Sequence, residues 1–213
     1  MIIGIDSSFD KTFTGIAVGL KVNVAKLYSE ISKIALKRGI KNIHWRKMSL
    51  KERKFFDSSF CPLLADSNVS FWIIKHKRPD FTGKKEYYLD AVPSEIAYML
   101  ERSLRRRYGS ALIECDDDYN VKGIENSTKV FLRKLFKQLG FRLTGRPVGL
   151  FERGGAVKTI VPRFIDGIER NLELEAKTAD YRDSGAVQLA DLALGLYNFD
   201  QKKYRKIFRV YEL

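Results

Sequence analysis

Short apolar runs separated by polar turns mark the β-strand candidates of this chain. Residues 1–5 are apolar and residues 12–20 are rich in β-branched residues and glycine, with the polar stretch 7–11 between them. This pattern predicts a β-hairpin. The apolar and aromatic run at residues 69–75 predicts a third strand, and the run at residues 110–115 predicts a compact buried strand.

Apolar residues at helical spacing lie between and after these runs. They predict a helical insertion within residues 22–67 and three later helices. The predicted helices span residues 22–38, 49–65, Pro93 to the stop at Gly109, 127–139 and 184–199. We interpret Gly39 and Gly140 as two further helix stops, because glycine readily adopts the left-handed conformation that ends a helix.

The last third of the chain gives a mixed picture. Residues 172–179 alternate apolar and charged side chains, which predicts a half-exposed fifth strand, whereas residues 145–170 have no clear period and are expected to be a loop or insertion. Five strands interleaved with helices predict the α/β class, with a mixed five-stranded sheet flanked by helices. A length of 213 residues fits one domain over residues 1–213.

The charge balance points to a polyanionic partner. The chain has 39 Lys and Arg against 26 Asp and Glu, a formal net charge of +13. Nucleic acid, either DNA or RNA, is the first expectation, because cations raise its local concentration and release its counterions. The basic residues gather in segments 33–54, 75–85 and 102–107. The alternative is a basic protein whose charges are only solvated.

Other residue types exclude several kinds of site. The two cysteines, Cys61 and Cys115, lie far apart, which speaks against a disulfide framework and a thiolate zinc site. The two histidines, His44 and His76, are too few for a histidine-rich metal centre. No apolar run is long enough to cross a membrane, and the chain enters a strand pattern directly after Met1. We therefore expect a cytoplasmic protein without a membrane partner; its oligomeric state stays open, and a dimer is possible.

Asp6 is the first candidate site residue. It directly follows the apolar run that ends at Ile5, so it is expected at the end of a buried strand, where open α/β sheets place their ligands. The alternative is an Asx turn with Ser7 and Ser8, which aspartate readily forms.

Asp191 is the second candidate. It is the one charged residue in the predicted helix 184–199, and it shares a face with Val187 and Leu194. A buried carboxylate needs a cation, a strong donor or a metal, so we expect one of these beside it; a structural pair with Lys or Arg is the alternative. Asp183 and Gln188 are close enough in sequence to line the same pocket.

A third acidic group follows the strand at residues 110–115. Glu114 and Asp116 are two residues apart and therefore face the same side of a strand, whereas Asp117 and Asp118 begin a turn. Such a cluster repels itself unless divalent cations bind, and hard oxygen ligands favour Mg²⁺ or Mn²⁺. The alternative is a solvated acidic turn.

Two segments carry a resemblance to a known family. Residues 3–18, from Ile3-Gly-Ile-Asp6 to Thr14-Gly15-Ile-Ala-Val18, resemble the first hairpin of RuvC-type resolvases and related ribonuclease-H-like nucleases. In that family a catalytic Asp ends strand one and a Thr-Gly pair begins strand two, although Ser7-Ser8 replaces the common Pro-Gly here. Residues 183–195 resemble the family's last helix, with Asp191 at the catalytic position, and are similar to a poorly characterised prokaryotic branch of the superfamily.

The resemblance implies a ribonuclease-H-like fold and a Mg²⁺- or Mn²⁺-dependent endonuclease with a two-metal mechanism. It implies that Asp6 bridges the metals, that Asp191 and either Asp116 or Glu114 hold one each, and that Asp183 is a further candidate ligand. Asp117 stays open as the central carboxylate. A non-catalytic nucleic-acid-binding protein with a degenerate site is the main alternative. A two-domain sugar-kinase or actin-like ATPase would need a longer chain.

Overall fold

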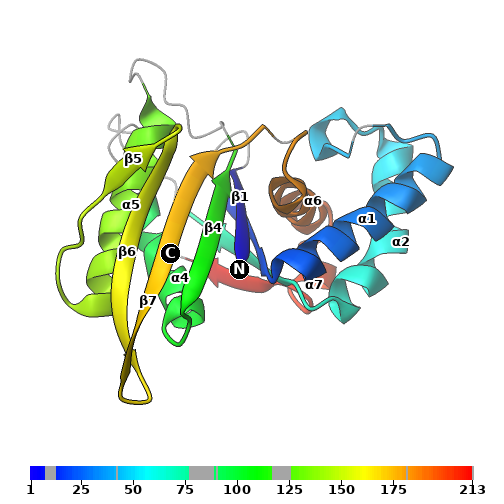
Figure 1. Ribbon diagram of the computed structural model, residues 1–213. Coiled ribbons are helices and arrows are strands. Elements are labelled where there is room, and N and C mark those ends of the chain that lie inside the picture. Colours follow the sequence, from blue (N-terminus) through cyan, green and yellow to red (C-terminus); the bar gives the residue numbers. More distant parts are fainter. Residues whose placement is uncertain are drawn as a thin grey trace. The chain divides into compact units, whose positions relative to one another are not determined.

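Two units make up the chain, Met1–Arg78 with Ala179–Leu213 as unit 1 and Pro79–Thr178 as unit 2. The structure is a computed structural model, shown in Figure 1. It describes residues 1–7, 13–41, 43–76, 89, 91–116, 126–180 and 182–212.

The sheet of unit 1 begins with three consecutive antiparallel strands. They are β1 (Ile2–Ser7), β2 (Phe13–Gly19) and β3 (Ser70–Lys75), and the short strand β8 (Arg209–Glu212) pairs in parallel with β3. In this register Asp6 lies opposite Gly15, and Gly15 lies opposite Ile73. The predicted hairpin and third strand are therefore confirmed, whereas β8 was not predicted.

Three helices of unit 1, α1 (Lys21–Lys37), α2 (Leu50–Asp66) and α6 (Gly185–Phe199), agree closely with the predicted ones, whereas η1 (Trp45–Lys47) and α7 (Gln201–Tyr204) were not predicted. Gly39 has a left-handed backbone after α1, as a helix stop requires. Ser49 and Glu52 form a capping box at the start of α2, in which each side chain binds the backbone N–H of the other residue.

Helix α6 lies directly against the first hairpin, as Figure 1 shows for β1. Glycines make this close approach possible. A Cβ atom at Gly4 would overlap the carbonyl group of Ala186, and one at Gly15 would lie 2.7 Å from the carbonyl oxygen of Ala190. All of α6 from Ala186 to Tyr197 is consequently buried.

Unit 2 contains four strands. Strand β4 (Gly109–Cys115) is parallel to β7 (Ile168–Thr178), β6 (Ala156–Ile165) is antiparallel to β7, and β5 (Phe151–Arg153) is antiparallel to β6. Helices α4 (Val92–Leu104) and α5 (Ser127–Thr144) pack on each other, and α5 also contacts β6 and β7. The predicted α/β class, with mixed β-sheet and flanking helices, is confirmed.

Residues 145–170 were expected to be a loop or an insertion, and the loop alternative is wrong. This segment contains β5, β6 and the start of β7. Two features conceal β6 in the sequence: it contains Pro162, which normally argues against an internal strand, and its outward positions include the exposed Ile160 and Phe164. Apolar side chains on both faces remove the alternation that identifies a half-buried strand.

Two predicted helix stops are also wrong. Helix α5 continues past Gly140 to Thr144, and Gly145 caps it with a left-handed backbone. Gly140 is a packing position, because a Cβ atom there would overlap the side chain of Val148. Helix α4 ends at Leu104, and Gly109 begins β4 instead. In the described part of the chain, no helix is both long and apolar enough to cross a membrane.

The close packing of α6 on β1 predicts a large effect for Gly4→Ala. The new methyl group would meet backbone atoms of Ala186, which cannot move aside without displacing the helix, so we expect a loss of about 3 kcal/mol or more in the free energy of unfolding. Gly149→Ala is the matched control, because nothing lies within 4 Å of its Cβ position. Urea denaturation measures both; similar midpoints for the two variants would contradict the packing described here.

Candidate active site

Asp6 is a buried residue of β1 that faces α6. Its exposed fraction is 4%, and it lies in the strand ladder opposite Gly15 rather than in a turn. Alternate strand residues share a face, and Gly4, two positions earlier, contacts α6. The Asp6 side chain is therefore directed to the helix side of the sheet.

Asp191 is buried within α6, with an exposed fraction of 8%. Its Oδ2 atom accepts a hydrogen bond from the backbone N–H of Trp45 at 2.9 Å and one from Nδ1 of His44 at 3.0 Å. The expected strong donors are thus present, supplied by a histidine and a backbone amide rather than by Lys or Arg. Within the described residues, its Oδ1 atom accepts no hydrogen bond.

The partners of Asp191 are themselves held in place. The Trp45 ring packs so tightly on α6 that a Cβ atom at Gly195 would overlap it. Arg53 of α2 donates from Nε to the Trp45 carbonyl at 3.2 Å, and its guanidinium lies 5.6 Å from the centre of the Trp45 ring. Segment 43–48 is therefore fixed by α6 on one side and by α2 on the other.

The positions of Asp6 and Asp191 meet at a single helix–strand contact. Asp6 lies opposite Gly15, Gly15 contacts the Ala190 carbonyl, and Asp191 follows Ala190. Directly opposite residues of antiparallel strands have Cα atoms roughly 5 Å apart. Unit 1 thus places the backbones of these two predicted residues beside the same contact, while the Oδ2 atom of Asp191 binds segment 43–48.

The residues just before α6 differ from this buried pair. Asp183 is exposed in the turn that precedes the helix, and Ser184 caps the helix by accepting a hydrogen bond from the Val187 N–H. Asp180 is also exposed, and hydrogen bonds from Arg182 lower its pKa to about 2. Gln188 is buried on α6, as the predicted pocket required.

A second buried polar group lies on the opposite face of the hairpin. Thr14 Oγ1 and His76 Nε2 are hydrogen-bonded at 2.8 Å, and both residues are buried. Ser7 lies opposite Thr14 in the register, and its buried hydroxyl has no hydrogen-bond partner among the described residues. His76 belongs to the basic segment 75–85 of the sequence; only the pairing of β2 with β3 reveals that it is buried beside Thr14.

The remaining predicted carboxylates belong to unit 2. Glu114 is buried in β4, and Lys177 Nζ lies 3.1 Å from its Oε1 because the two residues are opposite each other in parallel strands. Asp116 directly follows β4 and is half-buried. Asp117 and Asp118 fall outside the described residues.

The carboxylates fit a divalent cation in part. Asp6 and the Oδ1 atom of Asp191 are hard oxygen donors of the kind that Mg²⁺ and Mn²⁺ prefer. Against this, no group of three or more His, Cys, Asp or Glu side chains in the described ranges is placed to hold a metal ion.

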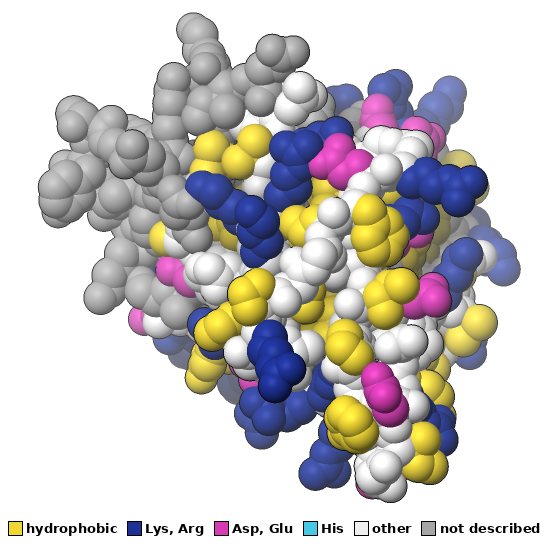
Figure 2. Space-filling view, turned by 60° about the vertical axis from the view of Figure 1, so that its left-hand side comes forward, with side chains coloured by type: hydrophobic (Ala, Val, Ile, Leu, Met, Phe, Trp, Pro, Cys, Tyr) yellow, Lys and Arg dark blue, Asp and Glu magenta, His cyan; other side chains and the backbone are white. Residues whose placement is uncertain are grey.

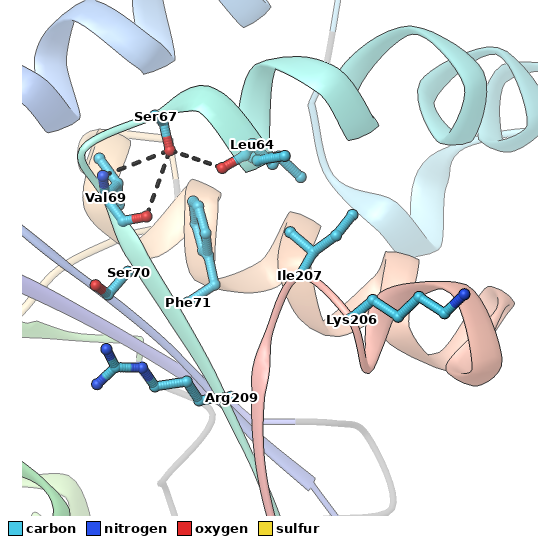
Figure 3. A pocket seen from close by; sticks show the side chains of 9 residues that line it. Leu64, Ser67, Val69, Ser70, Phe71, Lys206, Ile207 and Arg209 are labelled. Atoms are coloured by element: carbon cyan, nitrogen blue, oxygen red, sulfur yellow. Dashed lines mark hydrogen bonds between the residues drawn. The ribbon is translucent and has the colours of Figure 1, made fainter.

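A cavity of about 260 Å³ lies elsewhere in unit 1 (Figure 3). Leu64, Val69, Phe71 and Ile207 form its apolar part, while Lys206 and Arg209 extend in opposite directions at its edge. Ser70, which lines the cavity, lies opposite Val18 of β2, and Val18 lies opposite Ile3 near the start of β1. Asp6 is near the other end of β1. The cavity is therefore at the other end of the sheet from Asp6.

Comparisons with known proteins give no match: no family model matches the chain, and no curated protein or solved structure is significantly similar to it. The interpretation of the site depends on the geometry described above.

The hydrogen bonds of Asp191 predict that its removal destabilises the protein. Asp191→Ala leaves the buried Trp45 N–H without an acceptor, so we expect a loss of about 2–3 kcal/mol in unfolding free energy. Asp191→Asn keeps an acceptor oxygen and should lose about 1 kcal/mol or less. Asp183→Ala, at an exposed position, is the control and should change stability by less than about 0.5 kcal/mol. Equal losses for the alanine and asparagine variants in urea denaturation would show that the hydrogen bonds are not the cause.

Proposed function

We propose that the chain is a metal-dependent nuclease that hydrolyses phosphodiester bonds of DNA or RNA. The observation that carries this proposal is the meeting of two buried carboxylate positions, Asp6 on a strand and Asp191 on a helix, at the Gly15–Ala190 contact. A buried carboxylate is unfavourable unless a cation or hydrogen-bond donors compensate its charge. A cation bound by both carboxylates would give these buried residues a catalytic function.

The order of elements supports a ribonuclease-H-like fold. The first hairpin and its antiparallel third strand, the parallel pair β4 and β7, and the final long helix against the hairpin agree with what the resemblance implies. Strands β5, β6 and β8 are additions to a five-stranded core of this type.

Each residue then has a distinct task. Asp6 and the Oδ1 atom of Asp191 would hold the cation. Bound Mg²⁺ or Mn²⁺ supplies Lewis acidity and lowers the pKa of a bound water. His44 and the Trp45 amide position Asp191 by fixing the rotation of its carboxylate. In the reaction a water oxygen bonds to phosphorus, the bond from phosphorus to one sugar oxygen breaks, and that oxygen takes up a proton.

A non-catalytic nucleic-acid-binding protein is the second candidate. Both hydrogen bonds to Asp191 use one oxygen for a structural purpose, and Glu114 is already paired with Lys177. A carboxylate that the fold itself neutralises has less need of a metal. A protein of this kind would bind nucleic acid without cleaving it.

The proposal predicts metal-dependent cleavage that requires Asp6. With Mg²⁺ or Mn²⁺, the protein should cut at least one substrate among labelled single strands, duplexes and branched junctions of DNA and RNA, and EDTA should stop it. Asp6→Asn removes a charged ligand and should lower the rate by about 100-fold or more. The matched control Asp66→Asn, at an exposed position at the end of α2, should keep the activity.

Circular dichroism tests whether the Asp6→Asn variant is folded, and calorimetric titration with Mn²⁺ measures its metal binding. Unchanged cleavage by folded Asp6→Asn, or equal Mn²⁺ binding by both proteins, contradicts the nuclease proposal. Nucleic-acid binding without cleavage of any substrate favours the second candidate.

A further inference from the structure

Six exposed cations gather where α1 ends and α2 begins. We call them the α1–α2 basic surface: Lys33, Lys37, Arg38, Lys41, Lys51 and Lys54. In the ranges that the structure describes, none of them forms an ion pair. Their charge is therefore not neutralised within the described part of the protein.

Several cations of unit 2 are paired with acidic side chains. Glu152 pairs with both Lys129 and Arg133, and Lys158 pairs with Glu175 at 2.7 Å. Figure 2 brings the left-hand side of Figure 1 forward and shows Lys and Arg dispersed among acidic and hydrophobic side chains. In the α1–α2 basic surface, by contrast, no described acidic side chain pairs with any of the six cations.

Local packing brings the two parts of the α1–α2 basic surface together. The Arg38 guanidinium lies 4.9 Å from the centre of the Phe55 ring, which joins the end of α1 to α2. Lys33 and Lys37 are one turn apart on α1, and Lys51 and Lys54 are nearly one turn apart on α2. The four lysines consequently form two short rows.

Helix stability does not account for Lys51 of α2. Lys51 lies in its first turn, where the positive end of the helix dipole disfavours cations, and Lys54 lies just beyond that turn. Only Glu52 in the first turn opposes this effect. Lys51 is thus a cation at a position that destabilises its helix, and it forms no ion pair among the described residues. Such a cation is typical of a site that binds a negatively charged molecule.

The α1–α2 basic surface is joined to the candidate active site through segment 43–48. This segment connects α1 to α2, and its His44 and Trp45 bind the Asp191 carboxylate. Arg53 of α2 donates to the carbonyls of Trp45 and Arg46 at 3.2 and 3.3 Å. A polyanion on the surface would therefore lie along the element that positions Asp191.

We propose that the α1–α2 basic surface binds the sugar–phosphate backbone of a nucleic acid. This inference rests on the proposed function in one respect: that function identifies the polyanion as the nucleic-acid substrate. The surface is then the place beside the candidate active site where the backbone of that substrate is held. Repeated phosphates match rows of lysines, and binding releases the counterions that both carry. The interaction is with the backbone, so the surface should bind nucleic acids with little sequence preference.

Fluorescence anisotropy with labelled duplex DNA and single-stranded RNA, in EDTA so that metal-dependent cleavage cannot occur, tests this surface. The four-site variant is Lys33→Gln, Lys37→Gln, Lys51→Gln and Lys54→Gln. The control variant removes the same number of exposed cations that form no ion pair with another described residue: Lys137→Gln, Arg153→Gln, Lys202→Gln and Lys206→Gln. Thermal melting tests whether both variants are folded.

The four-site variant should bind about tenfold more weakly or worse at physiological salt, and the control should change by less than about threefold. The slope of log K against log salt for duplex DNA should become shallower by about 0.9 for each phosphate that the variant no longer neutralises. Equal weakening of both variants shows that only net charge matters, and it overturns the proposed surface.

The binding and cleavage assays separate the two proposals. If the protein binds through this surface but never cuts with Mg²⁺ or Mn²⁺, the surface stands and the nuclease proposal fails. If it cuts and the four-site variant binds normally, the nuclease proposal stands and the surface fails. Absence of nucleic-acid binding, or binding only to phosphatidylserine-containing vesicles, also overturns the surface.

Discussion

The contact of α6 with β1 and β2 is the constraint on which the rest of unit 1 depends. Helices normally keep a side-chain layer between their backbone and a sheet, but Gly4 and Gly15 remove that layer here. The helix backbone lies directly on the hairpin, so nearly every residue of α6 is enclosed. A helix enclosed in this way must be apolar on all sides, which explains why Asp191 is its one charged residue.

Burial of Asp191 in turn determines how the α1–α2 insertion packs. A buried carboxylate without donors would be strongly destabilising, and α6 has no donor side chain at the right place. Segment 43–48 supplies two donors, and Gly195 provides the space that the Trp45 ring fills. The hydrogen bonds and the ring contact fix the same segment, so one polar requirement positions two helices.

Periodic and local features of the fold could be predicted from the sequence. The hairpin, α1, α2 and α6 follow from apolar spacing, and Asp191 is conspicuous because the helix around it has no other charge. Strand β6 was missed because Pro162 and exposed apolar side chains hide its alternation, and β8 because four residues carry too little pattern. Gly140 shows the same ambiguity, since a glycine required by packing looks like a helix stop.

The partners within the candidate site could not be predicted for a different reason. His44 and Trp45 meet Asp191 across nearly 150 positions of sequence, and the Glu114–Lys177 pair depends on the register of two parallel strands. Hydrogen bonds of this kind are a product of the tertiary fold, so no local pattern encodes them. Asp6 and Asp191 were found because strand position and charge are local properties, whereas what neutralises them is not.

Anchoring and metal binding are compatible tasks for Asp191, because a carboxylate has two oxygen atoms. His44 and Trp45 both bind Oδ2, and the described residues leave Oδ1 without a hydrogen bond. A carboxylate whose rotation is already fixed loses less conformational freedom when it binds a cation, which is how outer hydrogen bonds assist metal ligands in general. The two hydrogen bonds that first suggest a purely structural role thus also orient the oxygen that a metal would need.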